Sequence, residues 1–406
     1  MNNKFLDKTW IEINKSSLIK NIAQFKKIIS PKVKFCAVVK SNAYGHGLSE
    51  VAKICQENGA DWLGVDSIDE ALILKKAGVA KLPILILGYV PLARLFEAVT
   101  NQFRLTVYNK ETILALVEIP NSKFQIPNKS QIQNFKIQNK SKIKNLKSEI
   151  INVHIKVETG TSRQGVLEKD ILDFVRLIKK YPQINIEGLS THFANIEDTT
   201  DHSYAMMQLE RFKRIVALLE KNGISIPIKH TACSAATILF PQTHFDMVRV
   251  GISMYGLWSS RETRVSANSL RRINLQPALI WKTKIAQIKE LETGTPISYG
   301  LTEKLSRDSK LAILPVGYWD GYDRGLSSIG NVLVGGKRCK VLGRVCMNMI
   351  IVDVTDVSDV KIEDEAVLLG KQGNEEISAD EIAQKIGTIN YEVVTRINPL
   401  IKRVSI

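Results

Sequence analysis

The feature that most constrains the fold of this chain is an alternation of short apolar, β-branched runs with segments of helical periodicity. Eight such runs fall between residues 33 and 253, and helical segments such as 168–180 and 204–223 lie between them. Strands that alternate with helices form a parallel sheet covered by helices, and eight such units are typical of a (β/α)8 barrel of about 250 residues. The predicted strands are 33–40, 61–66, 82–88, 103–108, 151–158, 184–191, 227–232 and 247–253.

The pattern changes beyond about residue 265. Apolar, β-rich runs now follow one another without helical segments between them, and Gly-Gly and Gly-Lys pairs interrupt them. This pattern favours a separate, mainly antiparallel β domain. The sequence therefore predicts an α/β chain in which residues 12–264 form the barrel and residues 265–406, together with 1–11, form the β domain.

A low-complexity segment interrupts the barrel at about residues 121–150. It holds seven lysines and one glutamate, a net +6 of the +15 that the whole chain carries. It also contains a tandem repeat, FQIPNKSQIQN (124–134) followed by FKIQNKSKIKN (135–145). With few strong apolar residues and no aromatic pattern, it is interpreted as a solvated insertion before the fifth strand, at the end of the barrel away from the strand carboxyl ends. The remaining charge is spread over the chain, so no nucleic-acid partner is expected.

Cysteine usage and hydropathy indicate the compartment. The five cysteines are widely spaced and include no C-x-x-C pair, so the sequence predicts neither a disulfide framework nor a zinc site. No stretch approaches the roughly 20 apolar residues that a membrane span requires. We therefore expect a cytoplasmic protein with no membrane partner.

Reactive side chains follow the carboxyl ends of several predicted strands, where barrel enzymes carry their active sites. These residues are Lys40, Arg163, His192, His230, Ser234 and Arg249, with Gly251 and Ile252 after the eighth strand. The predicted mouth is cationic and has no cluster of Asp, Glu and His at metal spacing. An organic anion fits such a mouth better than a metal ion does.

Lys40 narrows the choice of ligand. A lysine can bond to an aldehyde when a positive field or desolvation favours its neutral amine, and small residues after the seventh and eighth strands suit a phosphate. Pyridoxal phosphate has both an aldehyde and a phosphate. From placement alone, a sugar-phosphate enzyme fits equally well, because this barrel hosts many chemistries.

Ten ordered segments resemble the alanine racemases, which are fold-type III pyridoxal-phosphate enzymes with a barrel and a C-terminal β domain. The resemblance covers the whole chain apart from the insertion. It also implies a homodimer with shared active sites. The most telling segments are AVVKSNAYGHG (37–47), KVETGTSRQG (156–165), LSTHF (189–193), HTACSAA (230–236), MVRVGISMYGL (247–257), ISYG (297–300) and GRVCMNM (343–349).

The resemblance assigns the catalytic roles. Lys40 would bond to the cofactor aldehyde and act as the base on one face of the substrate. Tyr299 of a second subunit would be the acid/base on the opposite face, in a hydrogen-bonded network with His192 and Arg249. Arg249 would face the pyridine nitrogen and keep it unprotonated, since a guanidinium holds its own proton.

The resemblance also assigns the residues that hold the cofactor phosphate. They are Tyr44, Ser234, Gly251, Ile252 and Tyr391, which combine hydroxyls with backbone N–H donors.

The remaining residues implied by the resemblance surround the substrate. Arg163 would contact the phenolic oxygen of the cofactor and the substrate carboxylate, and the backbone amide of Met347 would reach that carboxylate across the dimer. Tyr318 and Tyr391 would restrict the entrance to small side chains. Lys156 is a candidate for carbamylation, which would orient Arg163.

The implied activity is racemisation of alanine, which would supply D-alanine for peptidoglycan. A racemase for serine or basic amino acids is the nearest alternative; a decarboxylase of the same fold and a non-catalytic cofactor carrier are less favoured. Three positions depart from the family pattern: Thr161-Ser162 replaces Met-Gly, Cys233 replaces Asn, and Asn348 replaces Asp. We expect the first departure to stiffen the loop that carries Arg163.

Overall fold

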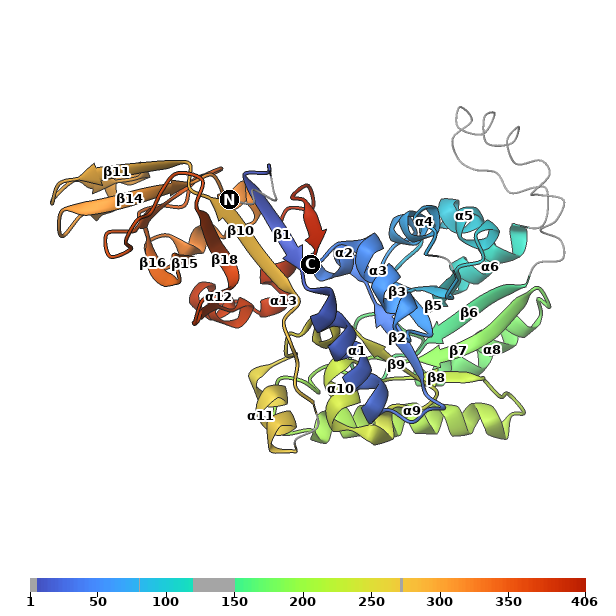
Figure 1. The fold of residues 1–406 in the computed structure, drawn as a ribbon. Coiled ribbons are helices and arrows are strands. Elements are labelled where there is room, and N and C mark those ends of the chain that lie inside the picture. The colour runs from blue at the N-terminus through green and yellow to red at the C-terminus, as the bar shows by residue number, and fades with distance from the viewer. Residues whose placement is uncertain (1–5, 80, 120–149, 271–272) are drawn as a thin grey trace, which may run out of the picture.

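The computed structural model describes residues 6–79, 81–119, 150–270 and 273–406. Two bodies lie side by side, a barrel covered by helices and a separate sheet that contains most of the C-terminal third of the chain (Figure 1). Residues 120–149, which include nearly all of the predicted insertion, lie outside the described residues. They fall between α6 (Lys110–Glu118) and β6 (Ile151–Lys156).

The barrel has eight parallel strands in the order β8-β7-β6-β5-β4-β3-β2-β9. Each predicted strand is confirmed. Backbone hydrogen bonds from Asp246 N to Lys229 O (2.9 Å) and from Arg249 N to Ala232 O (3.0 Å) join the eighth strand to the seventh and nearly close the barrel. The strands are β2 (Lys34–Val38), β3 (Trp62–Val65), β4 (Ile84–Ile86), β5 (Arg104–Val107), β6 (Ile151–Lys156), β7 (Ile184–Ser190), β8 (Ile228–His230) and β9 (Met247–Val250).

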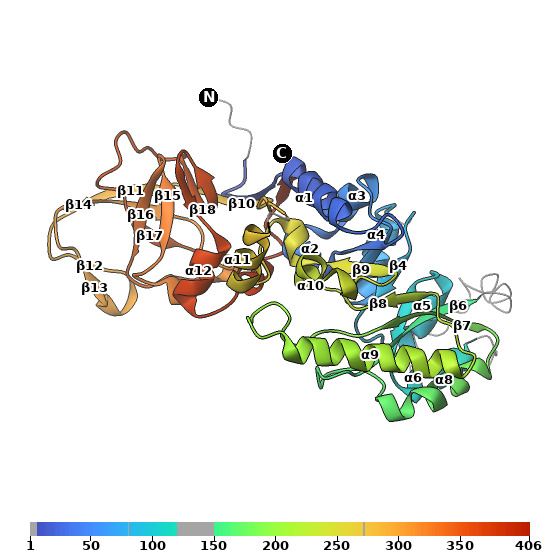
Figure 2. The ribbon, with the colours of Figure 1, turned by 90° about the horizontal axis from the view of Figure 1, so that it is seen from below.

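Amphipathic helices cover the outside of the barrel (Figure 2). In α8, for example, Ile171, Phe174, Val175 and Ile178 are buried, which is the helical spacing of one apolar face. The two helical segments named from the sequence, 168–180 and 204–223, correspond to α8 and α9. The helices of this part are α1 (Lys15–Ile28), α2 (Lys40–Tyr44), α3 (Leu48–Glu57), α4 (Ile68–Lys76), α5 (Leu95–Thr100), α6 (Lys110–Glu118), α8 (Ile171–Lys179), α9 (Ser203–Lys221), α10 (Ser234–Leu239) and α11 (Arg261–Ser269).

The second body is built on a ten-stranded, mainly antiparallel sheet, as predicted, which we call the C-terminal sheet. The N-terminal strand β1 (Thr9–Ile13) belongs to it, antiparallel to β10 and parallel to β20. The other strands of this body are β10 (Leu279–Lys284), β11 (Gln287–Leu291), β12 (Pro296–Ile297), β13 (Glu303–Lys304), β14 (Ser309–Leu314), β15 (Asn331–Val334), β16 (Lys337–Leu342), β17 (Ile350–Asp353), β18 (Glu365–Gln372), β19 (Glu375–Ile377) and β20 (Arg403–Ser405), of which β12 and β13 form a separate pair.

Two helices in this body differ from the sequence-based expectation of strands alone. They are α12 (Ala379–Ile386) and α13 (Asn390–Thr395), between β19 and β20. The Ser378 side chain caps α12 by accepting a hydrogen bond from Glu381 N. Both helices are short, so each offers little periodicity among the surrounding strand patterns. They matter here because they lie over the mouth of the barrel.

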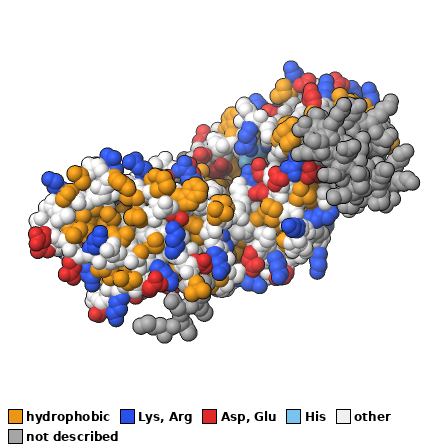
Figure 3. Space-filling model, turned by 90° about the horizontal axis from the view of Figure 1, so that it is seen from above, with side chains coloured by type: hydrophobic (Ala, Val, Ile, Leu, Met, Phe, Trp, Pro, Cys, Tyr) orange, Lys and Arg blue, Asp and Glu red, His pale blue; other side chains and the backbone are white. Residues whose placement is uncertain are grey.

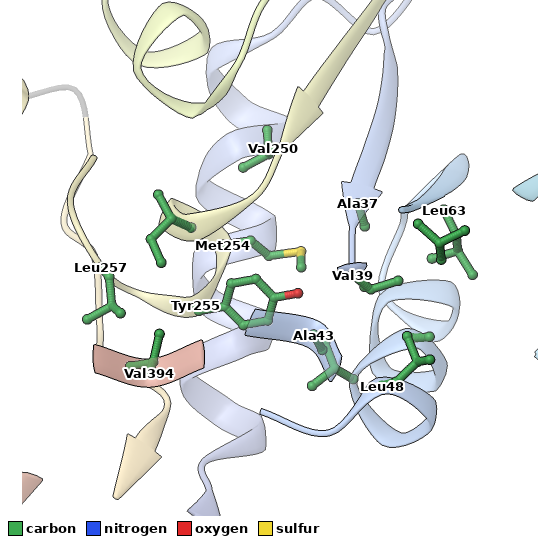
Figure 4. Packing of buried hydrophobic residues seen from close by; sticks show 14 of the residues in the cluster. Ala37, Val39, Ala43, Leu48, Leu63, Val250, Met254, Tyr255, Leu257 and Val394 are labelled. Carbon is green, nitrogen blue, oxygen red and sulfur yellow. The ribbon is translucent and has the colours of Figure 1, made fainter. Parts of the chain in front are cut away.

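The hydrophobic core continues from the barrel to α13. Figure 4 shows Tyr255 between Met254, Ala43 and Val394, at the junction of the barrel mouth and α13. Its hydroxyl donates a hydrogen bond to Val38 O at 2.9 Å, and this bond fixes the carboxyl end of β2. Among the described residues, no helix is long and apolar enough to cross a membrane.

Candidate active site

A cavity of about 1360 Å³ opens at the carboxyl ends of the barrel strands, and residues of α12 and α13 line its opposite side. It collects most of the predicted site residues from elements that are far apart in the sequence. Those that line it are Lys40, Tyr44, Lys156, Arg163, His192, Ser234, Arg249, Gly251, Ile252 and Tyr391.

Lys40 begins an unusual turn. The four residues Ser41 to Tyr44 all have φ between 52° and 55°, the left-handed conformation that costs an L-residue roughly 1–2 kcal/mol. Contacts on both sides hold this turn. Asn42 N donates to Glu70 Oε1 (3.2 Å), and a Cβ on Gly45 would lie 2.0 Å from Val394 O of α13. The turn brings Lys40 and Tyr44 to the same cavity.

Asp66 forms an ion pair with the Lys40 amine, with 3.2 Å between Nζ and Oδ1. It also lines the cavity. The sequence reasoning did not select Asp66, although its position directly after β3 places it at the barrel mouth, where a polar residue could have been noticed.

Arg249 is buried at the base of the cavity and has fixed partners. Nη1 donates to His230 Nδ1 (2.6 Å) and His230 O (2.8 Å), while Nη2 donates to Thr191 O (2.8 Å) and Thr231 O (3.1 Å). These bonds use the four Nη hydrogens. Within the described chain, the Nε–H is therefore the donor left for a ligand. Burial lowers the pKa of Arg249, and the guanidinium stays charged because its ordinary pKa is above 12.

A directed chain of hydrogen bonds continues from Arg249 into the barrel core. Because a guanidinium only donates, His230 Nδ1 must accept, and His230 Nε2–H then donates to His154 Nδ1 (2.8 Å). His154 Nε2–H in turn donates to Glu187 (3.3 Å). A Cβ on Gly188 would lie 2.2 Å from His154 Nδ1, so glycine makes room for this ring. The sequence analysis named His230 but missed His154, which stands inside an apolar strand.

The pKa shifts of these groups agree with the direction in which the hydrogen bonds are donated. Burial, followed by the charge of Arg249, places the pKa of His230 well below its ordinary value, and burial also lowers the pKa of His154. Burial alone would raise the pKa of Glu187, but its bonds with His154 and Arg104 outweigh burial and lower it. Both histidines are therefore neutral, and the carboxylate that ends the chain is ionised.

The part of the cavity that Tyr44, Ser234, Gly251 and Tyr391 line suits a phosphate. Ser234 Oγ accepts a hydrogen bond from Gly251 N at 3.0 Å, and a Cβ on Gly251 would lie 2.4 Å from the Tyr44 hydroxyl. The rings of Tyr44 and Tyr391 are 6.1 Å apart. Burial raises the pKa of both phenols, so both hydroxyls are neutral donors.

The loop that carries Arg163 is held by Glu158. Its carboxylate accepts hydrogen bonds from Gly160 N (2.5 Å), Thr161 N (2.6 Å) and Arg163 N (3.1 Å). The Thr161 hydroxyl also donates to His192 O at 2.6 Å. This bond ties the loop to the end of β7 and supports the expectation that Thr161 stiffens it.

Two groups near this loop have strongly lowered pKa values. Burial, followed by the charges of Arg163 and Arg249, lowers the pKa of Lys156 to about 8. Among the described residues, its amine makes one hydrogen bond, a long one of 3.5 Å to Gln164. Burial and the same cations place the pKa of His192 well below its ordinary value. The cavity therefore contains a neutral imidazole and a lysine that is readily deprotonated.

Four predicted residues do not line this cavity, and one of them is His230, which is buried and bonds to Arg249. Tyr299, Met347 and Tyr318 belong to the second body, and they are 72%, 54% and 43% exposed. The expected network of Tyr299 with His192 and Arg249 is therefore not formed within one chain. Arg249 bonds to His230, Thr191 and Thr231 instead. Among the described residues, no group of His, Cys, Asp and Glu could hold a metal ion.

Comparison with known proteins gives a consistent relationship over nearly the whole chain. Residues 13–259 match the family model for the N-terminal domain of alanine racemase, and residues 278–405 match that for its C-terminal domain. Curated alanine racemases from Methanococcus maripaludis and Halothermothrix orenii are each 42% identical to this chain. The matches cover 97% and 99% of this chain, and 98% of each relative.

Solved structures give the same relationship. The structure of alanine racemase from Bacillus anthracis with bound L-Ala-P superposes with a TM-score of 0.87 at 34% identity, covering 99% of this chain and 96% of that one. Alanine racemase from a D-cycloserine-producing Streptomyces lavendulae gives a TM-score of 0.86 at 30% identity, covering 99% and 98%. Fold, cavity and full-length similarity thus lead to one conclusion: the chain belongs to the alanine racemase family.

Proposed function

We propose that this protein interconverts L-alanine and D-alanine, with pyridoxal phosphate as its cofactor. The observation that carries the proposal is the Lys40 amine in the same cavity as the buried Arg249, in a chain similar over its full length to alanine racemases. The D-alanine produced would serve peptidoglycan synthesis.

The residues present fit pyridoxal phosphate. The Lys40 amine is available to bond to its aldehyde. Ser234, Gly251 and the neutral hydroxyls of Tyr44 and Tyr391 suit its phosphate. The free Nε–H of Arg249 suits an unprotonated ring nitrogen, which accepts a hydrogen bond. When bound, the cofactor withdraws electrons from the amino acid and makes its α-proton acidic.

Racemisation also requires a proton donor and acceptor on each face of the α-carbon. Lys40 supplies one of them from the cavity wall. The described chain offers Tyr299 for the other role only from outside its own cavity, since that side chain is 72% exposed. We therefore propose that the protein works as a homodimer, in which Tyr299 and the Met347 amide of one subunit complete the site of the other.

An exposed apolar surface on the second body supports this assembly. Hydrophobic side chains are spread over that end of the molecule in Figure 3. Backbone hydrogen bonds from Tyr318 N to Cys346 O (3.0 Å) and from Trp319 N to Met347 O (3.0 Å) join two segments that carry such side chains. The exposed residues are Tyr299, Leu301, Tyr318, Trp319, Met347 and Met349. An apolar surface of this kind, next to residues that the site requires, favours a second copy as its partner.

The alternatives differ in their expected products. A serine or basic amino-acid racemase would share every residue discussed here and differ only at the entrance. A decarboxylase would release CO2, and a cofactor carrier would exchange no α-proton. Arg249 disfavours the decarboxylase, because an arginine makes the ring a weaker electron sink than a carboxylate in that place would.

One experiment separates these functions. The protein loaded with pyridoxal phosphate is incubated separately with L-alanine, L-serine and L-lysine in D2O. Deuterium at the α-carbon is followed by NMR, and the enantiomers are separated chromatographically. We expect D-alanine to form fastest, with deuterium at the α-carbon. Faster serine or lysine racemisation would overturn the substrate assignment, and the absence of α-exchange would overturn the racemase itself.

Lys156 gives a separate prediction. Because its pKa is about 8, about half of the amine is neutral at that pH, and the neutral amine is the form that reacts with CO2. In bicarbonate buffer near pH 8 we expect native mass spectrometry to show one added CO2 per chain, which is lost on acidification. The Lys156→Arg variant should lack this adduct and the surface variant Lys180→Arg should keep it. An adduct that persists in Lys156→Arg would contradict the assignment.

A further inference from the structure

We propose that Asp66 is the counter-charge of Lys40 during proton transfer at the α-carbon of the substrate. It acts as a positioning residue, because it contacts the catalytic amine rather than the substrate. The inference rests on the proposed function, since it concerns the proton that Lys40 takes and returns.

The first observation is the direct contact. Asp66 Oδ1 lies 3.2 Å from Lys40 Nζ, and both residues line the cavity. Other acidic residues line the same cavity, but no hydrogen bond or ion pair joins them to Lys40 in the described chain; they are Glu197, Asp198, Glu262 and Asp380.

The second observation is that three barrel strands combine to fix Asp66. Its backbone N–H donates to Glu70 Oε2 (2.9 Å), while Glu70 Oε1 accepts from Asn42 N, in the turn that follows Lys40. The Glu70 carboxylate, on α4, therefore fixes the residues that follow β2 relative to those that follow β3. At the end of β4, a Cβ on Gly88 would lie 2.4 Å from Asp66 O and 3.0 Å from its Oδ2. Glycine thus leaves the space that this carboxylate occupies.

The third observation is the charge of the surroundings. Arg163, Lys156 and Arg249 line the same cavity, and their charges add to burial in lowering the pKa of His192. A proton that arrives on Lys40 creates one more cation there. Without a counter-charge, that cation would be disfavoured, and proton removal by Lys40 would be slower. Asp66 supplies the compensating negative charge at hydrogen-bonding distance.

A kinetic signature follows. L- and D-alanine have equal free energies in water, so the loss of Asp66 must lower kcat/KM by the same factor in both directions. The loss of Asp66 affects the two proton transfers unequally, however, because it slows only the transfer between Lys40 and the α-carbon. The α-deuterium isotope effect should rise for the enantiomer whose proton Lys40 removes, and it should fall for the other enantiomer.

The experiment compares Asp66→Asn, Asp66→Glu and the control Asp69→Asn with the wild-type enzyme. Asp69 lies three residues further along and pairs with Arg94 at 2.8 Å, outside the cavity. We expect kcat/KM of Asp66→Asn to fall about tenfold in both directions. The two isotope effects should diverge in Asp66→Asn and return toward the wild-type values in Asp66→Glu. Asp69→Asn should behave as wild type.

A second readout needs no turnover. In full-length protein stripped of cofactor, Lys40 is methylated with formaldehyde and cyanoborohydride at neutral pH, and the labelled peptide is quantified by mass spectrometry. Asp66→Asn should label faster, because the Lys40 amine loses its 3.2 Å ion pair with the carboxylate and is freer to react. Unchanged labelling together with unchanged isotope effects would overturn the proposal. A wild-type protein that does not racemise alanine would overturn the proposed function instead, and the labelling would still report the contact.

Discussion

Replacing Lys40 with alanine should abolish racemisation, lowering kcat by at least about a thousandfold while the chain keeps its fold. The substitution removes both the amine that bonds to the cofactor and the base on one face of the substrate. It should leave the barrel intact, because Lys40 is partly exposed and, within the described chain, its ion pair is the one with Asp66. Activity is measured by chiral separation of the products, and folding by circular dichroism.

The matched control for this variant is Lys53→Ala. Lys53 is an exposed lysine of α3, on a neighbouring helix, and it does not line the cavity. It should retain wild-type activity and stability. A Lys40→Ala enzyme that still exchanges the α-proton at more than one hundredth of the wild-type rate would contradict the role given to this lysine.

Replacing Tyr299 with phenylalanine should lower kcat by about a hundredfold or more, because it removes only the hydroxyl that serves the second face. A more specific prediction concerns mixtures of the Lys40→Ala and Tyr299→Phe proteins. If each site takes Lys40 from one subunit and Tyr299 from the other, mixing inactive Lys40→Ala and Tyr299→Phe proteins creates hybrid dimers with one intact site. With random exchange, about half of the dimers are hybrids, so activity should recover to about a quarter of the wild-type level.

The mixing experiment needs evidence that subunits exchange. Native mass spectrometry of differently tagged chains would count the hybrids. Tyr181→Phe is the control, since this tyrosine lies outside the cavity and outside the exposed apolar surface of the second body. Hybrids that form without any recovery of activity would show that Tyr299 does not complete the site of its partner.

The sequence was most informative where a physical constraint repeats. Eight buried strands leave eight apolar runs, and their carboxyl ends all meet at one mouth, so Lys40, His192 and Arg249 could be placed together before any coordinates were known. The change of pattern also predicted that a mainly antiparallel sheet follows the parallel one, which the structure confirms.

The residues that were missed lack any such repetition. Asp66 is a single carboxylate after a strand, and nothing in its neighbours' spacing indicates that it reaches Lys40. His154 lies in an apolar strand, and only the folded barrel shows that its ring is hydrogen-bonded to that of His230. The helices α12 and α13 are too short for a clear period, and the position of α13 depends on its contact with Gly45, more than three hundred positions earlier.

The left-handed turn after Lys40 depends on residues that are synthesised much later than the turn itself. Its strained backbone rests on contacts from the last residues of the chain: Val394 O against Gly45, and the Arg403 side chain, which donates to Gly45 O at 3.1 Å. During synthesis the barrel segments leave the ribosome first, and Val394 and Arg403 follow more than three hundred residues after Gly45. The lysine that would bind the cofactor therefore gains its final geometry only after α13 and β20 have been synthesised, so a chain truncated before Val394 would contain the barrel without the contacts that fix the turn after Lys40.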